Sequence, residues 1–176
     1  MMEPRDSLHV LPGQTVGSRV ERAERGEGVG AVRDALPVLH VLPGQTPDGR
    51  EERVARLQRL AADVGQIAYG VHEHFGVGLL EKVYENALAH RLEKAGFQVE
   101  RQKPLKVFDI NGFCAGEYFC DLIVSGELIV ELKAVRALAP EHLAQTLNYL
   151  KITGNPVALL VNFGSFRFER RTVVSR

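Results

Sequence analysis

Two apolar runs separated by a helical segment dominate the C-terminal half of this sequence. The runs are ELIVELKAV, residues 127–135, and PVALLVNF, residues 156–163, and both have the length and apolar content of buried strands. Between them, Pro140 suits the first turn of a helix over PEHLAQTLNYLKIT, and Gly154 suits its end. A strand, a helix and a second strand of these lengths match a right-handed crossover between parallel strands. This half of the chain therefore predicts an α/β fold.

Two further helices are predicted ahead of these strands. From Glu51 to about His74, apolar residues recur near the 3.6-residue period of an amphipathic helix. A second helical pattern, LLEKVYENALAHRLEKAG, follows, and Gly96 is its natural stop. The expected apolar side of this second helix consists of Leu80, Val83, Tyr84, Ala87, Leu88 and Leu92.

Three strand-like segments come next and are predicted to be antiparallel neighbours. FQVERQKPLKVFDI and FCAGEYFCDLIV are joined across Asn111–Gly112, a strong short hairpin signal, and ELIVELKAV follows across Ser125–Gly126. A final strand, SFRFERRTVV, is expected at a sheet edge, where edge pairing offers a route to a homodimer. The order is helix, helix, three antiparallel strands, helix, strand, strand. It predicts an α/β sandwich with a mixed central sheet.

Residues 1–50 differ in composition from the rest of the chain. They are rich in Gly, Pro, Arg and Glu, and they repeat the octapeptide LHVLPGQT, at Leu8–Thr15 and again at Leu39–Thr46. Two copies cannot stack a solenoid core, so we interpret this stretch as a mostly disordered leader ahead of a folded domain over residues 51–176. The alternative is that translation begins further downstream, which N-terminal analysis of the native protein would exclude by finding either initial methionine.

Composition argues against several classes of protein. The chain of 176 residues is 45% hydrophobic and can bury a core, yet no apolar stretch approaches the roughly 20 residues of a membrane span. The N-terminus lacks the pattern of a secretion signal, so a cytoplasmic protein is expected. Cys114 and Cys120 match no zinc spacing and are expected to be reduced. A formal net charge of zero indicates no global basic field, and the lack of Trp gives little support for a base-stacking platform.

Three ionisable residues interrupt two of the predicted strands. Asp121 lies in YFCDLIV, and Glu131 and Lys133 lie in ELIVELKAV. Charged side chains are rarely buried unless they are paired or bind a metal, so these three residues suggest a site. Ordinary ion pairing is the alternative. Two converging carboxylates favour a hard cation such as Mg²⁺ or Mn²⁺, which neutralises their repulsion and leaves coordination positions for water and a phosphate oxygen.

Whether Asp121 meets Glu131 depends on the turn between their strands. A strict two-residue loop at Ser125–Gly126 would place Asp121 opposite Val130, whereas a three-residue loop or one bulge would place it opposite Glu131. A joint metal site requires the second register. Lys133, two residues beyond Glu131, is then expected to orient a nucleophilic water or to stabilise charge on the phosphorane.

The chain resembles a known family, the bacterial and archaeal GxxExxY proteins, which are placed in the PD-(D/E)XK nuclease superfamily. The resemblance rests on Gly78-Leu79-Leu80-Glu81-Lys82-Val83-Tyr84, on DLIV around Asp121, on VELKAV over residues 130–135, and on Gln145 with Tyr149. It covers roughly residues 57–168 and implies a restriction-endonuclease-like core of helix, three strands, helix and strand. One departure is Cys120, which stands where the superfamily name has proline.

The resemblance also implies roles for six residues. It implies metal binding by Asp121 and Glu131, catalysis by Lys133 with Glu81 as an additional acid, and a site lined by Gln145 and Tyr149. The last two share one face of a helix because they are four residues apart. Glu81 has a plainer alternative role, as a first-turn acid that favours the positive end of the helix dipole.

Three functional hypotheses follow. The first is a Mg²⁺- or Mn²⁺-dependent phosphodiesterase, a nuclease that acts on DNA or RNA. The second is a catalytically silent module of the same fold that binds nucleic acid or protein. The third is a structural protein whose charges form a buried ion-pair network. Carboxylates converging in an open cleft favour the first hypothesis, a blocked cleft favours the second, and closed salt bridges without an approach path favour the third.

Overall fold

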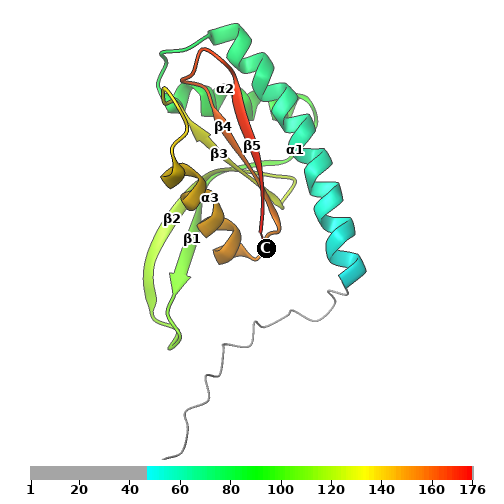
Figure 1. Ribbon diagram of the computed structural model, residues 1–176, viewed down its shortest axis with the longest axis vertical. Coiled ribbons are helices and arrows are strands. Elements are labelled where there is room, and N and C mark those ends of the chain that lie inside the picture. Colours follow the sequence, from blue (N-terminus) through cyan, green and yellow to red (C-terminus); the bar gives the residue numbers. More distant parts are fainter. Residues whose placement is uncertain (1–46, 176) are drawn as a thin grey trace, which may run out of the picture. The chain divides into compact units, whose positions relative to one another are not determined.

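The computed structural model describes residues 47–175, which form three helices and five strands (Figure 1). Their bounds are α1 Pro47–Phe75, α2 Glu81–Lys94, β1 Val99–Phe108, β2 Cys114–Val124, β3 Leu128–Lys133, α3 Pro140–Thr153, β4 Val157–Asn162 and β5 Glu169–Val174. Helix α1 begins at Pro47 rather than at Glu51, and so includes the last residues assigned to the leader. Both copies of the octapeptide lie outside the described residues.

The five strands form one mixed sheet in the order β1-β2-β3-β4-β5. Strand β2 is antiparallel to both β1 and β3, β3 is parallel to β4, and β5 is antiparallel to β4 at the edge. The parallel pair is the one predicted from the apolar runs, since α3 connects β3 to β4. Gly154, with φ 69°, ends α3 as predicted.

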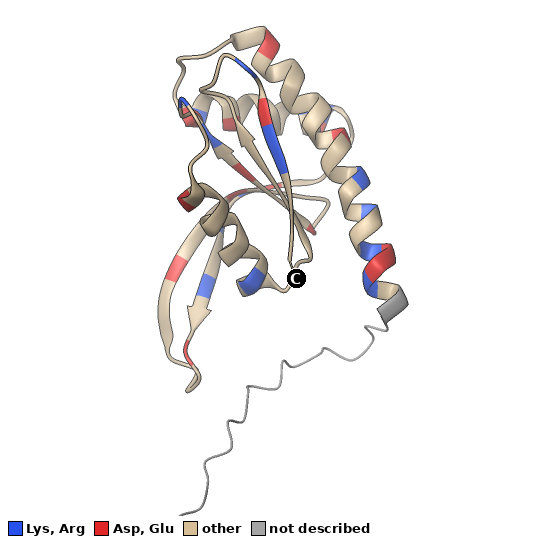
Figure 2. Cartoon of the chain, in the orientation of Figure 1, with Lys and Arg blue, Asp and Glu red and all other residues tan. Residues whose placement is uncertain are grey.

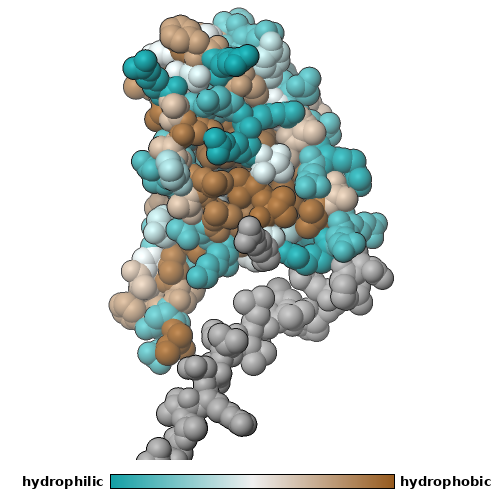
Figure 3. All heavy atoms as spheres, in the orientation of Figure 1, coloured by the Kyte–Doolittle hydropathy of each residue, from teal (hydrophilic) through white to brown (hydrophobic). Residues whose placement is uncertain are grey.

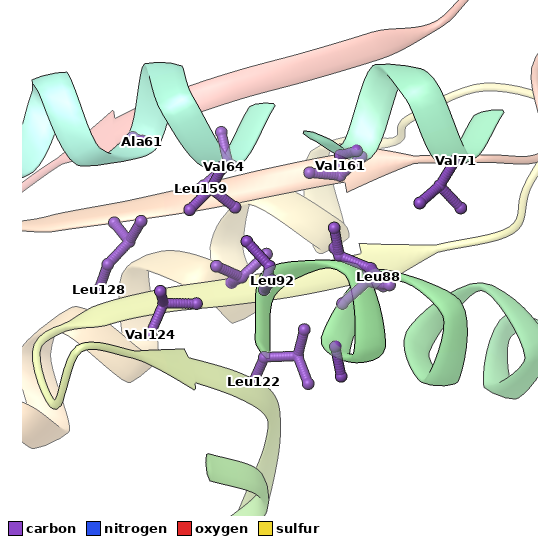
Figure 4. Close-up of a cluster of buried hydrophobic side chains, with 14 of the residues drawn as sticks. Ala61, Val64, Val71, Leu88, Leu92, Leu122, Val124, Leu128, Leu159 and Val161 are labelled. Carbon is purple, nitrogen blue, oxygen red and sulfur yellow. The ribbon is translucent and has the colours of Figure 1, made fainter. Parts of the chain in front are cut away.

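Helices cover both faces of the sheet, so the predicted α/β sandwich with a restriction-endonuclease-like element order is confirmed. On one face, α1 and α2 pack against the sheet through fully buried side chains such as Val64, Leu88 and Leu159 (Figure 4). On the other face, α3 buries Tyr149 and Leu150 in a second apolar cluster. The two clusters leave β3 and β4 buried on both sides, which explains their near-continuous apolar sequence.

The apolar side of α2 differs from the prediction. Leu80 is 77% exposed and Val83 is 39% exposed, whereas Tyr84, Leu88 and Leu92 are fully buried. Leu80 is the residue before the helix and does not follow its periodicity. The buried stripe follows the four-residue spacing from Tyr84, and Val83 is rotated from that stripe by about 100°.

Figure 3 shows apolar side chains gathered across the middle of one face of the molecule. Large exposed apolar residues also occur where strands are joined, and they include Phe108, Ile110 and Phe113 in the β1–β2 hairpin and Phe166 between β4 and β5. Within residues 47–175, no helix is both long and apolar enough to cross a membrane. Cys114 and Cys120 are free thiols, as predicted.

Candidate functional site

The turn between β2 and β3 brings the two strand carboxylates together. Leu122 pairs with Val130 and Val124 pairs with Leu128, so three residues form the loop. Two of the three, Ser125 and Gly126, have positive φ values of 52° and 73°. Continued by one residue, this register sets Asp121 opposite Glu131. It is the register that the metal hypothesis requires.

Asp121 lies where the regular alternation of β2 is interrupted. Cys120 belongs to the apolar cluster under α3 and Leu122 to the cluster under α1 and α2, although residues two apart in a strand normally share a face. Asp121 Oδ2 accepts a hydrogen bond of 2.8 Å from the backbone N–H of Leu132, and Oδ1 accepts one of 3.2 Å from Gln102 Nε2. Burial raises the pKa of Asp121, and the Leu132 hydrogen bond opposes this shift.

Glu131 is the most strongly perturbed acid of the site. Its residue is only 2% exposed, and its Oε1 accepts a 2.5 Å hydrogen bond from Lys133 Nζ. The other oxygen, Oε2, is buried without a hydrogen-bond partner. Burial, followed by the charge of Asp121, raises the pKa of Glu131 to about 8. An unsatisfied, buried carboxylate oxygen is costly unless a cation or a proton compensates it.

Lys133 supplies the only positive charge in contact with these carboxylates among the residues that the structure describes. Its side chain is 13% exposed. Burial alone would lower the pKa of Lys133, but the hydrogen bond to Glu131 and the negative charges of Glu131, Glu81 and Asp121 outweigh burial, so the pKa is raised. The ammonium group is therefore protonated at neutral pH and neutralises one of the three carboxylates.

Glu81 reaches the same site from the first turn of α2. Its Oε2 accepts a 3.0 Å hydrogen bond from the backbone N–H of Ala134, directly after β3. Burial raises the pKa of Glu81, and the charge of Lys133 opposes the shift. The dipole role proposed as its alternative does not account for this tertiary contact, which ties α2 to the end of β3.

Glu85 and Gln102 belong to the network although the sequence did not single them out. Glu85, on α2, is 3% exposed, and its Oε2 accepts a 2.8 Å hydrogen bond from Gln102 Nε2, which also contacts Asp121. Gln102 has a positive φ of 48°. The spacing of four residues from Glu81 to Glu85 was a usable signal, since such residues share a helical face. No local pattern marks Gln102, because only strand pairing brings it to Asp121.

Gln145 and Tyr149 form one unit on α3. Gln145 Nε2 donates a 2.6 Å hydrogen bond to the Tyr149 hydroxyl, which in turn donates to the backbone oxygen of Phe119 at 3.3 Å. Tyr149 is 1% exposed, and burial followed by the charge of Glu131 raises its pKa to about 12. Its hydroxyl therefore stays protonated near Glu131, and Gln145 is the more accessible member of the pair.

The residues present fit a divalent cation with few protein ligands. No group of three or more His, Cys, Asp or Glu side chains within residues 47–175 is arranged to hold a metal. The donors are the carboxylates of Asp121 and Glu131, whose oxygens are the hard ligands that Mg²⁺ and Mn²⁺ prefer. Magnesium commonly keeps several waters when one or two carboxylates hold it. Glu131 Oε2 is the atom that a cation would satisfy.

Comparison with known proteins agrees with this architecture. Residues 58–174 match the model of the PD-(D/E)XK nuclease superfamily. Among solved structures, the chain is similar to one described as "Crystal structure of SSO0001", with 16% identity and a TM-score of 0.43 over 53% of this chain. That similarity spans 49% of the other chain, about half its length. The comparison with curated proteins gives no match. Because the family match extends over more than half of its residues, this chain belongs to the PD-(D/E)XK nuclease superfamily.

Proposed function

We propose that this protein is a Mg²⁺- or Mn²⁺-dependent phosphodiesterase that cleaves DNA or RNA, within the GxxExxY branch of the superfamily. The observation that carries the proposal is Glu131 Oε2, a buried carboxylate oxygen without a partner, in the register opposite Asp121. Protein interiors rarely leave such an oxygen unsatisfied, and a cation is the simplest partner for two adjacent carboxylates.

Asp121 and Glu131 would hold the metal, which supplies neutralisation of phosphate charge and a lowered pKa for an attacking water. Leu132 N–H and Gln102 orient the Asp121 carboxylate through its two oxygens. Lys133 Nζ lies 2.5 Å from Glu131 Oε1 and has further hydrogens to donate. Those hydrogens suit it to orient the attacking water and to stabilise the negative charge that develops on the phosphate oxygens.

The remaining acids and the amide have supporting roles in this proposal. Glu81 fixes the backbone after Lys133 through Ala134 N–H, which limits where the lysine can reach. Tyr149 is buried, so it positions Gln145 rather than contacting substrate itself. Gln145 is the member of the pair that would donate or accept a hydrogen bond at the substrate.

A catalytically silent binding module is the second candidate, and a specific observation favours it. The Lys133–Glu131 ion pair and the hydrogen bonds to Asp121 satisfy three of the four carboxylate oxygens without any metal. A network that is already nearly closed can be a structural feature of the fold. The two candidates differ in one measurable property, the binding of a divalent cation.

Calorimetric titration with Mn²⁺ and Mg²⁺ tests the proposal, together with cleavage assays on mixed DNA and RNA. Asp121→Asn and Glu131→Gln are expected to lose metal binding and cleavage together. Glu117→Gln is the matched control, because it removes an exposed acid from the same strand as Asp121. Metal binding without cleavage would favour the silent module. No metal binding by the wild-type protein, with or without nucleic acid, would refute the catalytic proposal.

A further inference from the structure

A hollow of about 550 Å³ lies beside the site and is lined by Arg136, Gly164, Ser165, Phe166 and Arg167. These residues belong to the loop after β3 and to the loop between β4 and β5. Figure 1 shows that the two loops lie at the same end of the sheet, beyond the carboxyl ends of the parallel pair β3 and β4. In open α/β sheets, this end is where ligands commonly bind.

Buried contacts hold the two loops in place. Asn162 is fully buried, and its Oδ1 accepts hydrogen bonds from the backbone N–H groups of Val135 at 3.1 Å and Gly164 at 3.0 Å. Gly164 approaches the other loop so closely that an added Cβ would lie 2.4 Å from the Ala134 carbonyl carbon. The next residue, Ser165, accepts a 2.8 Å hydrogen bond from His72 Nε2. The walls of the hollow are therefore preorganised.

The chemistry of the lining suits one nucleotide of a polyanionic strand. Arg136 and Arg167 are exposed, and neither forms an ion pair or a hydrogen bond with any residue that the structure describes. Figure 2 shows basic positions on both loops. Phe166 is 93% exposed, which is unusual for an aromatic side chain. Guanidinium groups bind phosphate through paired donors, and an accessible ring offers a stacking surface to a base.

The hollow is continuous with the proposed catalytic residues along the chain. Arg136 follows Lys133 by three residues, and the Ala134 backbone between them is held by Glu81. A strand whose scissile phosphate lies at Lys133 would therefore have a neighbouring nucleotide near the hollow. Bases paired in a duplex keep their faces stacked on each other, so only an unpaired base can stack on Phe166.

We propose that this hollow binds the phosphate and the unpaired base of a nucleotide that neighbours the scissile one, so that the substrate is a single-stranded nucleic acid. The proposal rests on the proposed nuclease function. Arg136 and Arg167 contact the phosphate, and Phe166 stacks on the base. The sequence disfavoured a platform of several aromatic rings; the structure presents a single ring between two arginines.

Binding measurements without divalent metal test this proposal separately from catalysis. Fluorescence anisotropy would follow labelled DNA and RNA oligomers of about 20 nucleotides, single-stranded and duplex, over a series of salt concentrations. The variants are Arg136→Gln with Arg167→Gln, and Phe166→Ala. All three side chains are exposed, so the fold is retained. Arg59→Gln, which removes an exposed arginine from α1, is the matched control.

The double arginine variant is expected to reduce the salt dependence of single-strand binding by about 1.4 in the log–log slope, roughly 0.7 for each lost contact. Phe166→Ala is expected to weaken single-strand binding about tenfold and to leave duplex binding unchanged. Wild-type affinity and salt slope in these variants would overturn the proposal, and so would equal losses for single strands and duplexes. Losses confined to single strands in a protein that cleaves nothing would retain the hollow and refute only the catalytic function.

Discussion

Replacing Glu131 with glutamine should remove much of the pH dependence of stability in the metal-free protein. The pKa of Glu131 is raised from an ordinary 4.5 to about 8 in the folded state. Between these values the folded protein holds a proton that the unfolded chain releases. A raised pKa therefore contributes stability that is fully present below about pH 4.5 and is lost as the pH rises toward 8.

The magnitude follows from proton linkage. One proton of difference between the folded and unfolded states changes the free energy of unfolding by about 1.4 kcal/mol per pH unit. From pH 5.5 to 7.5, Glu131 should therefore cost the wild-type protein about 2.7 kcal/mol. Asp121 and Glu81 also have raised pKa values and act in the same direction, so the diagnostic quantity is the difference in slope between wild type and variant.

Urea unfolding in EDTA, followed by circular dichroism at about pH 5.5, 6.5 and 7.5, measures this difference. Glu131→Gln should show a shallower decline of unfolding free energy with pH than the wild type. Glu117→Gln, on the exposed part of β2, should follow the wild type. Parallel curves for wild type and Glu131→Gln would refute the reasoning, because they would mean that pairing with Lys133 outweighs burial and keeps Glu131 ionised.

Mn²⁺ affinity measured by calorimetry should increase as the pH rises toward 8, because the proton on Glu131 must leave before metal binds; a flat profile would contradict this. Lys133→Met should retain metal binding but lower the cleavage rate at least about a hundredfold, and an unchanged rate would remove the lysine from the mechanism. Gly164→Ala should lower the free energy of unfolding by about 1–3 kcal/mol in urea titrations, because its Cβ would meet the Ala134 backbone. Asn162→Ala should cost a similar amount, since it leaves two backbone N–H groups without their acceptor; an unaltered midpoint would argue against this.

Local signals were sufficient for the order of the elements. The apolar period of α1 predicted the burial of Leu57, Ala61 and Val64, and Gly154 ends α3 where expected. These signals succeed because helix periodicity and helix caps depend on residues within one or two turns. The same reasoning misassigned Leu80 and Val83, since the rotation of α2 about its axis is set by the sheet beneath it.

The sequence by itself determined which helices and strands form and that Asp121 and Glu131 lie in neighbouring strands. Only the tertiary structure decided that they face each other, because the choice between a two-residue and a three-residue loop depends on Glu127. The carboxylate of Glu127 pairs with Arg53 and Arg56 of α1, and its backbone oxygen accepts a 2.9 Å hydrogen bond from Asn155. These partners hold Glu127 in the loop and out of the strand pairing. They lie far from it in the sequence, so no pattern within the hairpin could reveal the register.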